Sequence, residues 1–373
     1  MIVEQIEIFD IVGRLKTPWR IASGPITELV SVVVRLTGSD GSQGYGECCC
    51  RGGARVIAAV IEDLLAPCVI GRSARDIGAI WADMYAILRN RGHTRGFMLE
   101  AMSGIDIALW DLASASAGLS LSGMLLGQGR RTVPAYASSI LIASPEDMAR
   151  EAQALSASGY HAIKMKIAGD PAADTARVRA VREAVGPGIR LMLDANSGFD
   201  APGAIAFCEG IRDQDVFWLE EPLPLDDLPG YRRLRQITGQ RIALGEGEFT
   251  AGGIREFLRD GLVDVVQPNV TRAGGITGTT RIAALAQAFN IPVALHTGAS
   301  GPICMAATLQ LAAALPGILM HEHMYLENPF EGVFEAPLPT PVNGMIAIPD
   351  GPGLGLRPDP HAIAAHLARP KAA

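Results

Sequence analysis

The sequence lacks an apolar run long enough to cross a membrane. None of its apolar stretches approaches the roughly eighteen residues that a membrane helix needs. Residues 1–12 alternate like a strand, and they lack both the basic start and the small-residue cleavage site of a secretory signal. The sequence therefore predicts a cytoplasmic protein with no membrane partner.

The chain also lacks the cysteine patterns of a disulfide framework or a zinc site. Three of its six cysteines are consecutive at positions 48–50, where neighbours on a strand cannot pair readily, and no CxxC pair occurs. Cys68, Cys208 and Cys304 each lie alone in apolar surroundings. We interpret the cysteines as buried or reduced structural residues.

An excess of positive charge is absent as well. The chain has 32 lysines and arginines against 39 acidic residues, which gives a formal net charge of −7. This charge provides no long-range attraction to nucleic acid or to an anionic membrane surface. Nucleic acid is therefore not expected as a partner.

The first part of the chain, residues 1–125, predicts an α+β unit. Two β-type runs within residues 28–48 flank the turn residues Ser39, Asp40, Gly41 and Ser42, which indicates a hairpin. Helical periodicity then extends over residues 56–126, with a helix stop at Gly118. At 373 residues the chain has room for such a unit beside one large α/β domain.

Strands and helices alternate over residues 126–325. Seven or eight β-type runs are each followed by a helical pattern, and regular units of this kind favour a closed parallel barrel. An open doubly wound sheet would need a glycine-rich phosphate turn after its first strand, which residues 134–144 lack. We expect the Pro- and Gly-rich residues 326–373 to pack back on the first unit as ordered coil, with a disordered tail as the alternative.

A polar side chain ends each of seven apolar runs in the barrel region. Because the carboxyl ends of barrel strands meet at one mouth, this series predicts a ring of polar groups. Its members are Lys164 with Lys166, Asp194, Glu220, Glu246, Asn269, His296 and Glu322.

Three carboxylates in this ring predict a site for a hard divalent cation. Asp194, Glu220 and Glu246 end successive strands, and burying them without a compensating charge would cost several kcal/mol each. Oxygen ligands of this kind suit Mg2+. Periodicity does not choose between Glu246 and Glu248, which are two residues apart and face the same way on a strand.

The lysine pair and the histidine predict proton transfer beside the metal. Lys164 and Lys166 share one face of a strand, so repulsion and burial should lower the pKa of at least one of them toward the working pH. Such a lysine can act as a general base, and His296 can act as base or acid on the other face of a substrate. The set suits removal of the proton next to a carboxylate, because a cation can stabilise the intermediate.

Several motifs together resemble the enolase superfamily, and within it the mandelate racemase subgroup. They are KMK (164–166), LDAN (193–196), WLEEP (218–222), GEGEF (245–249), QPN (267–269) and LHTG (295–298). The resemblance covers nearly the whole chain. It implies a modified (β/α)7β TIM-like barrel over residues 126–325, with an α+β capping domain formed by residues 1–125 and by the C-terminal segment 326–373.

The resemblance also implies roles for individual residues. Asp194, Glu220 and Glu246 are similar to the Mg2+ ligands of the family, which chooses Glu246 over Glu248. Lys166 resembles the base, Lys164 the partner that holds the substrate carboxylate, and Glu322 an acidic donor. Asn196 would face the same mouth and contact substrate oxygens.

Asn269 departs from the pattern of the mandelate racemase branch. That branch normally has an aspartate here, hydrogen-bonded to the histidine, whereas the muconate-lactonizing and dipeptide-epimerase branches have a lysine. An amide can orient an imidazole but cannot supply charge, so we expect His296 to be a weaker base than in a true dyad. Racemisation, which needs a base on both faces, should suffer most.

These considerations lead to three hypotheses about function. The first is an Mg2+-dependent dehydratase of a sugar acid or related hydroxy acid, the second a racemase or epimerase of such an acid. The third is a catalytically impaired paralogue or an altered chain that binds acid and metal. We expect a small-molecule carboxylate substrate and a homo-oligomer. The substrate pocket should be closed by cap residues Trp19, Arg20 and Arg51, and the cluster Arg89, Arg91, His93 and Arg95 is a further option.

Overall fold

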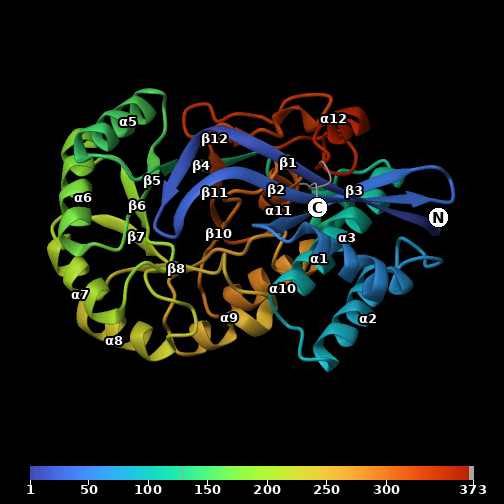
Figure 1. Cartoon of the computed structure of the whole chain (residues 1–373), viewed down its shortest axis with the longest axis horizontal. Coiled ribbons are helices and arrows are strands. Elements are labelled where there is room, and N and C mark those ends of the chain that lie inside the picture. The colour runs from blue at the N-terminus through green and yellow to red at the C-terminus, as the bar shows by residue number, and fades with distance from the viewer. Residues whose placement is uncertain (128, 369–373) are drawn as a thin grey trace, which may run out of the picture.

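The computed structural model describes residues 1–127 and 129–368 and contains two kinds of sheet. A three-stranded antiparallel sheet lies beside a closed barrel of parallel strands, and the barrel is wrapped by helices on its outside (Figure 1). The described chain has no helix that is both long and apolar enough to span a bilayer. The predicted class, a TIM-like barrel with an α+β cap, is confirmed.

The cap begins with a sheet in the order β1-β2-β3, and helices cover one of its faces. The predicted hairpin turn is present, since the Gly38 N–H donates to the Ser42 carbonyl at 2.8 Å. The longest helix of the cap packs closely on β3, because a Cβ on Gly46 would lie 1.9 Å from the Gly104 carbonyl oxygen. The elements are β1 (Val3–Ile21), β2 (Gly24–Gly38), β3 (Gln43–Cys50), α1 (Ala54–Val60), η1 (Ile61–Leu65), η2 (Ala66–Cys68), α2 (Ile77–Asn90), α3 (Phe97–Ser116) and α4 (Leu121–Leu126).

The barrel has eight parallel strands in chain order, and β11 pairs with β4 to close it. Its strands are β4 (Thr132–Ile140), β5 (Ala162–Lys166), β6 (Arg190–Asp194), β7 (Val216–Glu220), β8 (Ile242–Leu244), β9 (Val265–Val266), β10 (Val293–Leu295) and β11 (Ile318–Met324). The helices between them are α5 (Pro145–Ala157), α6 (Pro171–Val185), α7 (Ala201–Gly210), α8 (Leu228–Thr238), α9 (Thr250–Arg259), α10 (Gly275–Ala288) and α11 (Pro302–Ala314). No barrel helix follows β11 within residues 325–368, which matches the (β/α)7β pattern.

The C-terminal segment is ordered over residues 326–368, but only part of it contacts the cap. The helix α12 (Pro360–Ala365) lies against β1, and the Val12 N–H donates to the His366 carbonyl at 2.9 Å. The short strand β12 (Met345–Ala347) instead pairs antiparallel with residues 132–134 of β4. Those residues precede the pairing of β4 with β11, so β12 covers an edge that would otherwise be free. The segment also contains the short helix η3 (Glu331–Val333).

Large side chains fill the inside of the barrel below its polar mouth. Tyr136, Met192, Trp218 and Met320 form a buried cluster, with the rings of Tyr136 and Trp218 edge to face at 5.6 Å. This apolar floor keeps water from reaching the mouth from below. All six cysteines are buried and free, as their surroundings in the sequence suggested.

Candidate active site

The carboxyl ends of the barrel strands bring the polar ring together. Lys166 lies opposite Asp194 in the β5–β6 register, and Asp194 lies opposite Glu220 in the β6–β7 register. Lys164, Asp194 and Glu220 are fully buried, while Lys166 is partly exposed to the mouth. Strand register therefore places the charged groups of three neighbouring strands side by side.

Lys164 lies at the centre of the carboxylates. Its Nζ is 2.7 Å from Glu220 Oε1, 2.8 Å from Glu322 Oε1 and 3.5 Å from Asp194 Oδ2. Burial lowers the pKa of this lysine, but the attraction of Glu220 and Glu322 outweighs burial and raises the pKa well above its ordinary value. The sequence predicted a lowered pKa for at least one lysine of the pair, and Lys164 is not that lysine, because carboxylates that the spacing did not show surround it.

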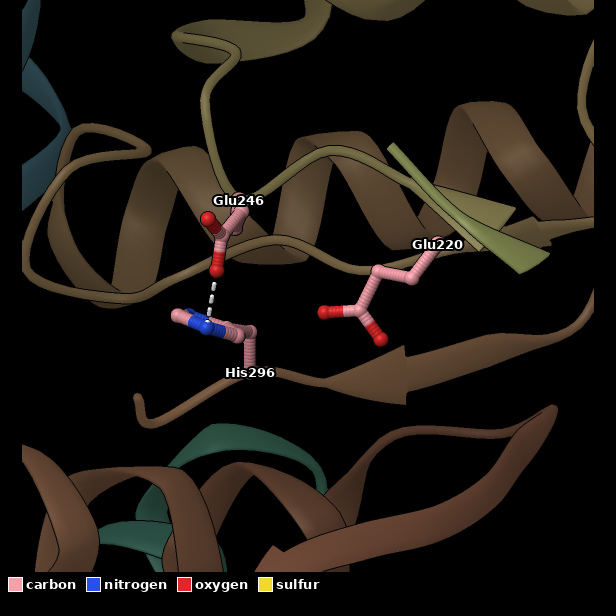
Figure 2. Close-up of side chains that lie close together, drawn as sticks. All are labelled: Glu220, Glu246 and His296. Carbon is pink, nitrogen blue, oxygen red and sulfur yellow. Dashed lines mark ion pairs between the residues drawn. The ribbon is translucent and has the colours of Figure 1, made fainter. Parts of the chain in front are cut away.

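Glu246 and His296 face each other across the mouth (Figure 2). The His296 Nε2 contacts a carboxylate oxygen of Glu246 and lies 3.7 Å from Glu322 Oε2. Burial raises the pKa of Glu246, but the positive charges of His296 and Arg51 prevail and hold it well below its ordinary value. Glu248 points elsewhere, because it pairs with Arg95 of the cap at 3.0 Å. The geometry thus agrees with the choice of Glu246 over Glu248.

The donor set fits a divalent cation. Four buried carboxylates gather here: Asp194, Glu220 and Glu322 contact the two lysine ammonium groups, and Glu246 contacts His296 and Arg51. Ligand atoms of Glu220, Glu246 and His296 lie within 4.8 Å of one another, and Asp194 adjoins Glu220 in register. Carboxylate oxygens of this kind are the hard ligands that Mg2+ and Ca2+ take.

Glu221 holds the loop that carries Glu246, a role that the sequence did not reveal. Its carboxylate accepts the N–H groups of Gly245 at 3.2 Å and Gly247 at 3.1 Å. The side chain points away from the mouth, because a strand turns neighbouring residues to opposite sides. Burial, followed by the charge of Glu246, raises the pKa of Glu221 to about 8. The only hint of this role in the sequence was that WLEEP contains a second glutamate, Glu221.

The pattern of charged residues at strand ends did not indicate two further residues that hydrogen-bond to the ring carboxylates. The Gln267 amide donates to Glu220 Oε2 at 2.8 Å, and the Ser138 hydroxyl donates to Glu322 Oε1 at 2.7 Å. Glutamine and serine carry no charge. Ser138 lies inside β4, and Gln267 precedes Asn269, the polar residue that ends its run. Periodic charge could not indicate them.

Asn269 contacts the histidine, as the resemblance implies for this position. Its Nδ2 lies 3.1 Å from His296 Nδ1 and 3.3 Å from the Ser300 hydroxyl. Its Oδ1 accepts both the backbone N–H and the hydroxyl of Thr271, at 2.9 and 2.6 Å. Gly298 has φ +50°, and a Cβ there would lie 2.4 Å from His296 Cε1, so a glycine makes room for the ring.

A cavity of about 40 Å³ lies above the ring. Three predicted substrate residues line it, namely Trp19, Arg51 and Asn196, and the Asn196 Oδ1 is buried without a hydrogen-bond partner. Arg51 is half exposed, with Nη2 3.8 Å from Glu246 Oε1. The rest of the wall includes apolar side chains that the sequence did not single out, namely Ile21, Ile26, Leu141, Met324 and Leu326.

Several cap residues that the sequence suggested do not reach this cavity. Arg20 is exposed on the outer side of the β1–β2 hairpin, because neighbouring residues of a strand alternate and Trp19 takes the inward side. None of Arg89, Arg91, His93 and Arg95 lines the cavity, and Arg95 is engaged by Glu248. The suggestion that this cluster binds substrate therefore gains no support from the cavity.

Comparison with known protein families agrees with this geometry. Residues 4–127 match the N-terminal domain of mandelate racemase and muconate lactonizing enzyme, and residues 147–362 match the enolase C-terminal domain-like family. The chain belongs to the mandelate racemase and muconate lactonizing enzyme family. This assignment confirms the resemblance to the enolase superfamily.

Relatives within the mandelate racemase and muconate lactonizing enzyme family are dehydratases, cycloisomerases and racemases. The chain is 37% identical to D-galactarolactone cycloisomerase of Agrobacterium fabrum over 92% of its own length and 93% of that protein. It is 31% identical to D-gluconate dehydratase of Thermoproteus tenax, over 91% and 70% of the two chains. It also superimposes on a racemase from Streptomyces coelicolor with bound magnesium, with a TM-score of 0.89, 29% identity and coverage of 98% and 100%. Members of the superfamily use Mg2+.

Proposed function

We propose that the protein is an Mg2+-dependent lyase of a sugar acid or related hydroxy acid. It removes the proton next to the substrate carboxylate and eliminates an oxygen substituent from the adjacent carbon. The observation that carries this proposal is the buried carboxylate ring, with Lys166 touching Asp194 on one side and His296 touching Glu246 on the other. A substrate above the ring has a proton-transfer group at each flank.

The residues divide into a binding set and a proton-transfer set. Asp194, Glu220 and Glu246 would hold Mg2+, which when bound would supply positive charge to the substrate carboxylate. Lys166 is the base, because it is the lysine of the pair that reaches the mouth. Lys164 orients the substrate carboxylate, and Asn196 offers its free Oδ1 to a substrate hydroxyl.

The relatives support elimination of a β-oxygen and suggest two forms of it. D-gluconate dehydratase is named for loss of water, which is the form we propose first. D-galactarolactone cycloisomerase is named for a reaction of a lactone ring, so a ring oxygen is the second candidate leaving group. The substrate partner is thus a small carboxylate, and the predicted homo-oligomer and cytoplasmic location remain predictions.

Proton exchange and product formation test the proposal. The protein is incubated in D2O with Mg2+ and a panel of sugar acids, and both α-deuterium and keto acid are measured by NMR and mass spectrometry. We expect both with at least one acid, and Lys166→Met should reduce the rate by a factor of about 100 to 10,000. The control Lys16→Met alters an exposed lysine paired with Glu327 and should keep full activity.

The same measurements separate the competing functions. Deuterated acid of inverted configuration without keto product would identify a racemase. Binding of an acid and Mg2+ without exchange would identify a non-catalytic binding protein. Either result would replace the lyase proposal.

A further inference from the structure

The outer face of β11 borders a second pocket, on the outside of the barrel. Neighbouring residues of a strand face opposite sides, so Met320 and Glu322 point into the barrel and His321 and His323 point outward. No barrel helix follows β11 within residues 325–368, and this face is covered by α11 and by coil of the C-terminal segment. A pocket of about 210 Å³ lies between them.

Most of the pocket wall is apolar. The apolar side chains come from α11 and from the C-terminal segment, and they are Pro302, Met305, Leu309, Leu338, Pro339 and Ile346. The lining residues Glu331, Pro337 and Thr340 are exposed, so the pocket opens to the surface. A small molecule can therefore enter it from solvent without passing through the barrel mouth.

One buried polar atom of this wall has no partner. His321 is 2% exposed, and its Nδ1 lacks a hydrogen-bond partner among the residues that the structure describes. The other polar groups are satisfied, because His323 Nδ1 lies 2.7 Å from the Tyr160 hydroxyl and the Asn328 amide makes two hydrogen bonds to the backbone, at 3.0 Å each. Buried polar atoms in folded proteins almost always have a partner. The unpaired nitrogen therefore points to a ligand that supplies one.

The two histidines do not form a metal site, although they share one face of the strand. A histidine metal site takes three or four protein ligands. Within residues 1–127 and 129–368, the one group of three metal-capable side chains that lie close enough to share an ion is Glu220, Glu246 and His296. The missing partner of His321 is therefore an organic group.

The charges around the pocket disfavour an acid as the ligand. In the described part of the chain no lysine or arginine lines the pocket, and the exposed carboxylate of Glu331 at its opening repels anions. Burial lowers the pKa of His321 to about 3, so its ring adds no positive charge. The pocket is thus unsuited to a second molecule of a carboxylate substrate.

A hydroxyl group on an apolar body matches the pocket. A neutral imidazole nitrogen either donates or accepts, and a hydroxyl can pair with it in both cases. Water alone fits less well, because a buried water needs two to four polar partners and one buried atom is unpaired here. An apolar cavity of about 150 Å³ holds benzene, so this pocket has room for a six-membered ring with a hydroxyl.

We propose that this pocket is a second binding site, which takes a small uncharged alcohol or phenol. The hydroxyl pairs with His321 Nδ1, and the ring or chain lies against α11 and residues 337–346. The site does not depend on the proposed function, because none of Asp194, Glu220, Glu246 and Lys166 lines it.

Two side chains separate the pocket from the candidate active site. Met324 and Leu326 line both the pocket and the cavity above the carboxylate ring, whereas Met305 lines the pocket but not the cavity. A ligand in the pocket therefore contacts both methionines, and a ligand in the active-site cavity contacts Met324 without Met305.

Methionine methyl NMR locates the ligand by this difference. The protein is labelled with 13C at its methionine methyl groups and titrated with phenol, and Met305→Leu and Met324→Leu assign the two signals. We expect saturable shifts of the Met305 and Met324 signals. The signal of Met84, buried in the cap helix α2, should not move.

Phenol and benzene share a ring, so their comparison isolates the hydroxyl. Both dissociation constants are measured by the same titration near pH 7, where a phenol is uncharged. In His321→Leu we expect benzene to bind as before and phenol to bind about 3- to 10-fold more weakly, the usual effect of losing one hydrogen bond. This variant should fold, because an apolar side chain replaces an unpaired buried polar group.

A matched pair of tryptophan variants checks the position of the site. Leu338→Trp places a larger side chain in the pocket from a coil and should block both ligands. Val342→Trp alters an exposed residue of the same segment outside the pocket and should leave both dissociation constants unchanged.

Three outcomes would overturn the proposal. Shifts at Met324 without Met305 would place the ligand in the active-site cavity. An equal change for phenol and benzene in His321→Leu would remove His321 as the partner of the hydroxyl. No saturable shift with either compound would mean that the pocket holds only water. Because these titrations contain no acid substrate, each outcome leaves the proposed function to its own test.

Discussion

Lys164 illustrates how neighbouring charges can reverse the effect of burial on one residue. Burial alone favours a neutral lysine, and the repeat Lys164-Met165-Lys166 suggested a second reason for a lowered pKa. The folded chain surrounds the ammonium group with Glu220, Glu322 and Asp194 at 2.7 to 3.5 Å. Attraction to these carboxylates prevails and raises the pKa of Lys164, which agrees with the proposal that Lys166 is the base.

Removing this charge should destabilise the protein strongly. Lys164→Met leaves the buried carboxylates without their partner, and breaking a buried ion pair in this way costs about 3–5 kcal/mol. Urea unfolding should show this loss in free energy of unfolding, and Mg2+ should recover part of it by supplying positive charge to the same oxygens. The exposed Lys16→Met serves as control. A variant as stable as the parent would show that the carboxylates are protonated or solvated.

Individual site residues were predictable only where they carried charge at a strand end. Asp194, Glu220, Glu246 and His296 stood out because each ended an apolar run. Thr271 did not, because it acts through a backbone N–H and a hydroxyl that bind a residue two positions away. The identity of a hydrogen-bond donor across strands depends on three-dimensional register, which periodicity does not contain.

At the scale of elements, the cap strand β3 contacts the start of helix α11 through one buried side chain. The buried carboxylate of Glu47 accepts the N–H of the N-cap residue Gly301 at 2.5 Å and of Cys304, in the first turn of α11, at 2.9 Å. It also accepts the Ser31 hydroxyl at 3.0 Å. These N–H groups have no partner inside the helix, and an acceptor at this end stabilises it. The loop from His296 to Gly301 is therefore anchored at its far end by the cap.

Glu47→Gln should weaken this anchor. A glutamine has one accepting oxygen, so its amide nitrogen would face a backbone N–H and leave that donor unpaired, at a cost of about 1–3 kcal/mol. Urea unfolding should show the loss, and kcat should fall because the His296 loop is less well held. Glu28→Gln, which alters an exposed residue of β2, is the matched control. A normal kcat with reduced stability would limit Glu47 to a purely structural role.

The element pattern was more predictable than the way the elements meet. Alternating β and α runs indicated the barrel, and turn residues indicated the β2–β3 hairpin, because both are local signals. The pairing of β12 with β4 depends on an edge that β4 leaves free at residues 132–134, before its pairing with β11 begins. The sequence also could not show which of Trp19 and Arg20 lines the cavity. The packing of the β1–β2 hairpin on the barrel decides which of its faces turns inward.

At the scale of the whole molecule, helix α3 connects all three parts of the chain. Asp106 accepts the N–H of Thr277 in α10 at 2.9 Å, which ties the cap to the barrel. Asp111 accepts the N–H groups of Tyr45 in β3 and Leu354 in the C-terminal segment, both at 2.8 Å. Both aspartates are buried, so the joints are shielded from water. Global stability should accordingly respond to the protonation of these two groups.

Stability should decrease as the pH rises from about 4 to about 7. Burial raises the pKa of Asp106 and of Asp111 to about 7, and the hydrogen bonds from backbone N–H groups offset this only partly. In the unfolded chain an aspartate titrates near 4, so in this window the folded state binds more protons, and each group contributes a slope of up to about 1.4 kcal/mol per pH unit. Urea unfolding at pH 5 and pH 8 measures the slope, which Asp111→Asn should reduce relative to the exposed control Asp350→Asn. Groups that titrate in both proteins cancel in this comparison, and identical slopes would mean that Asp111 is ionised throughout the range.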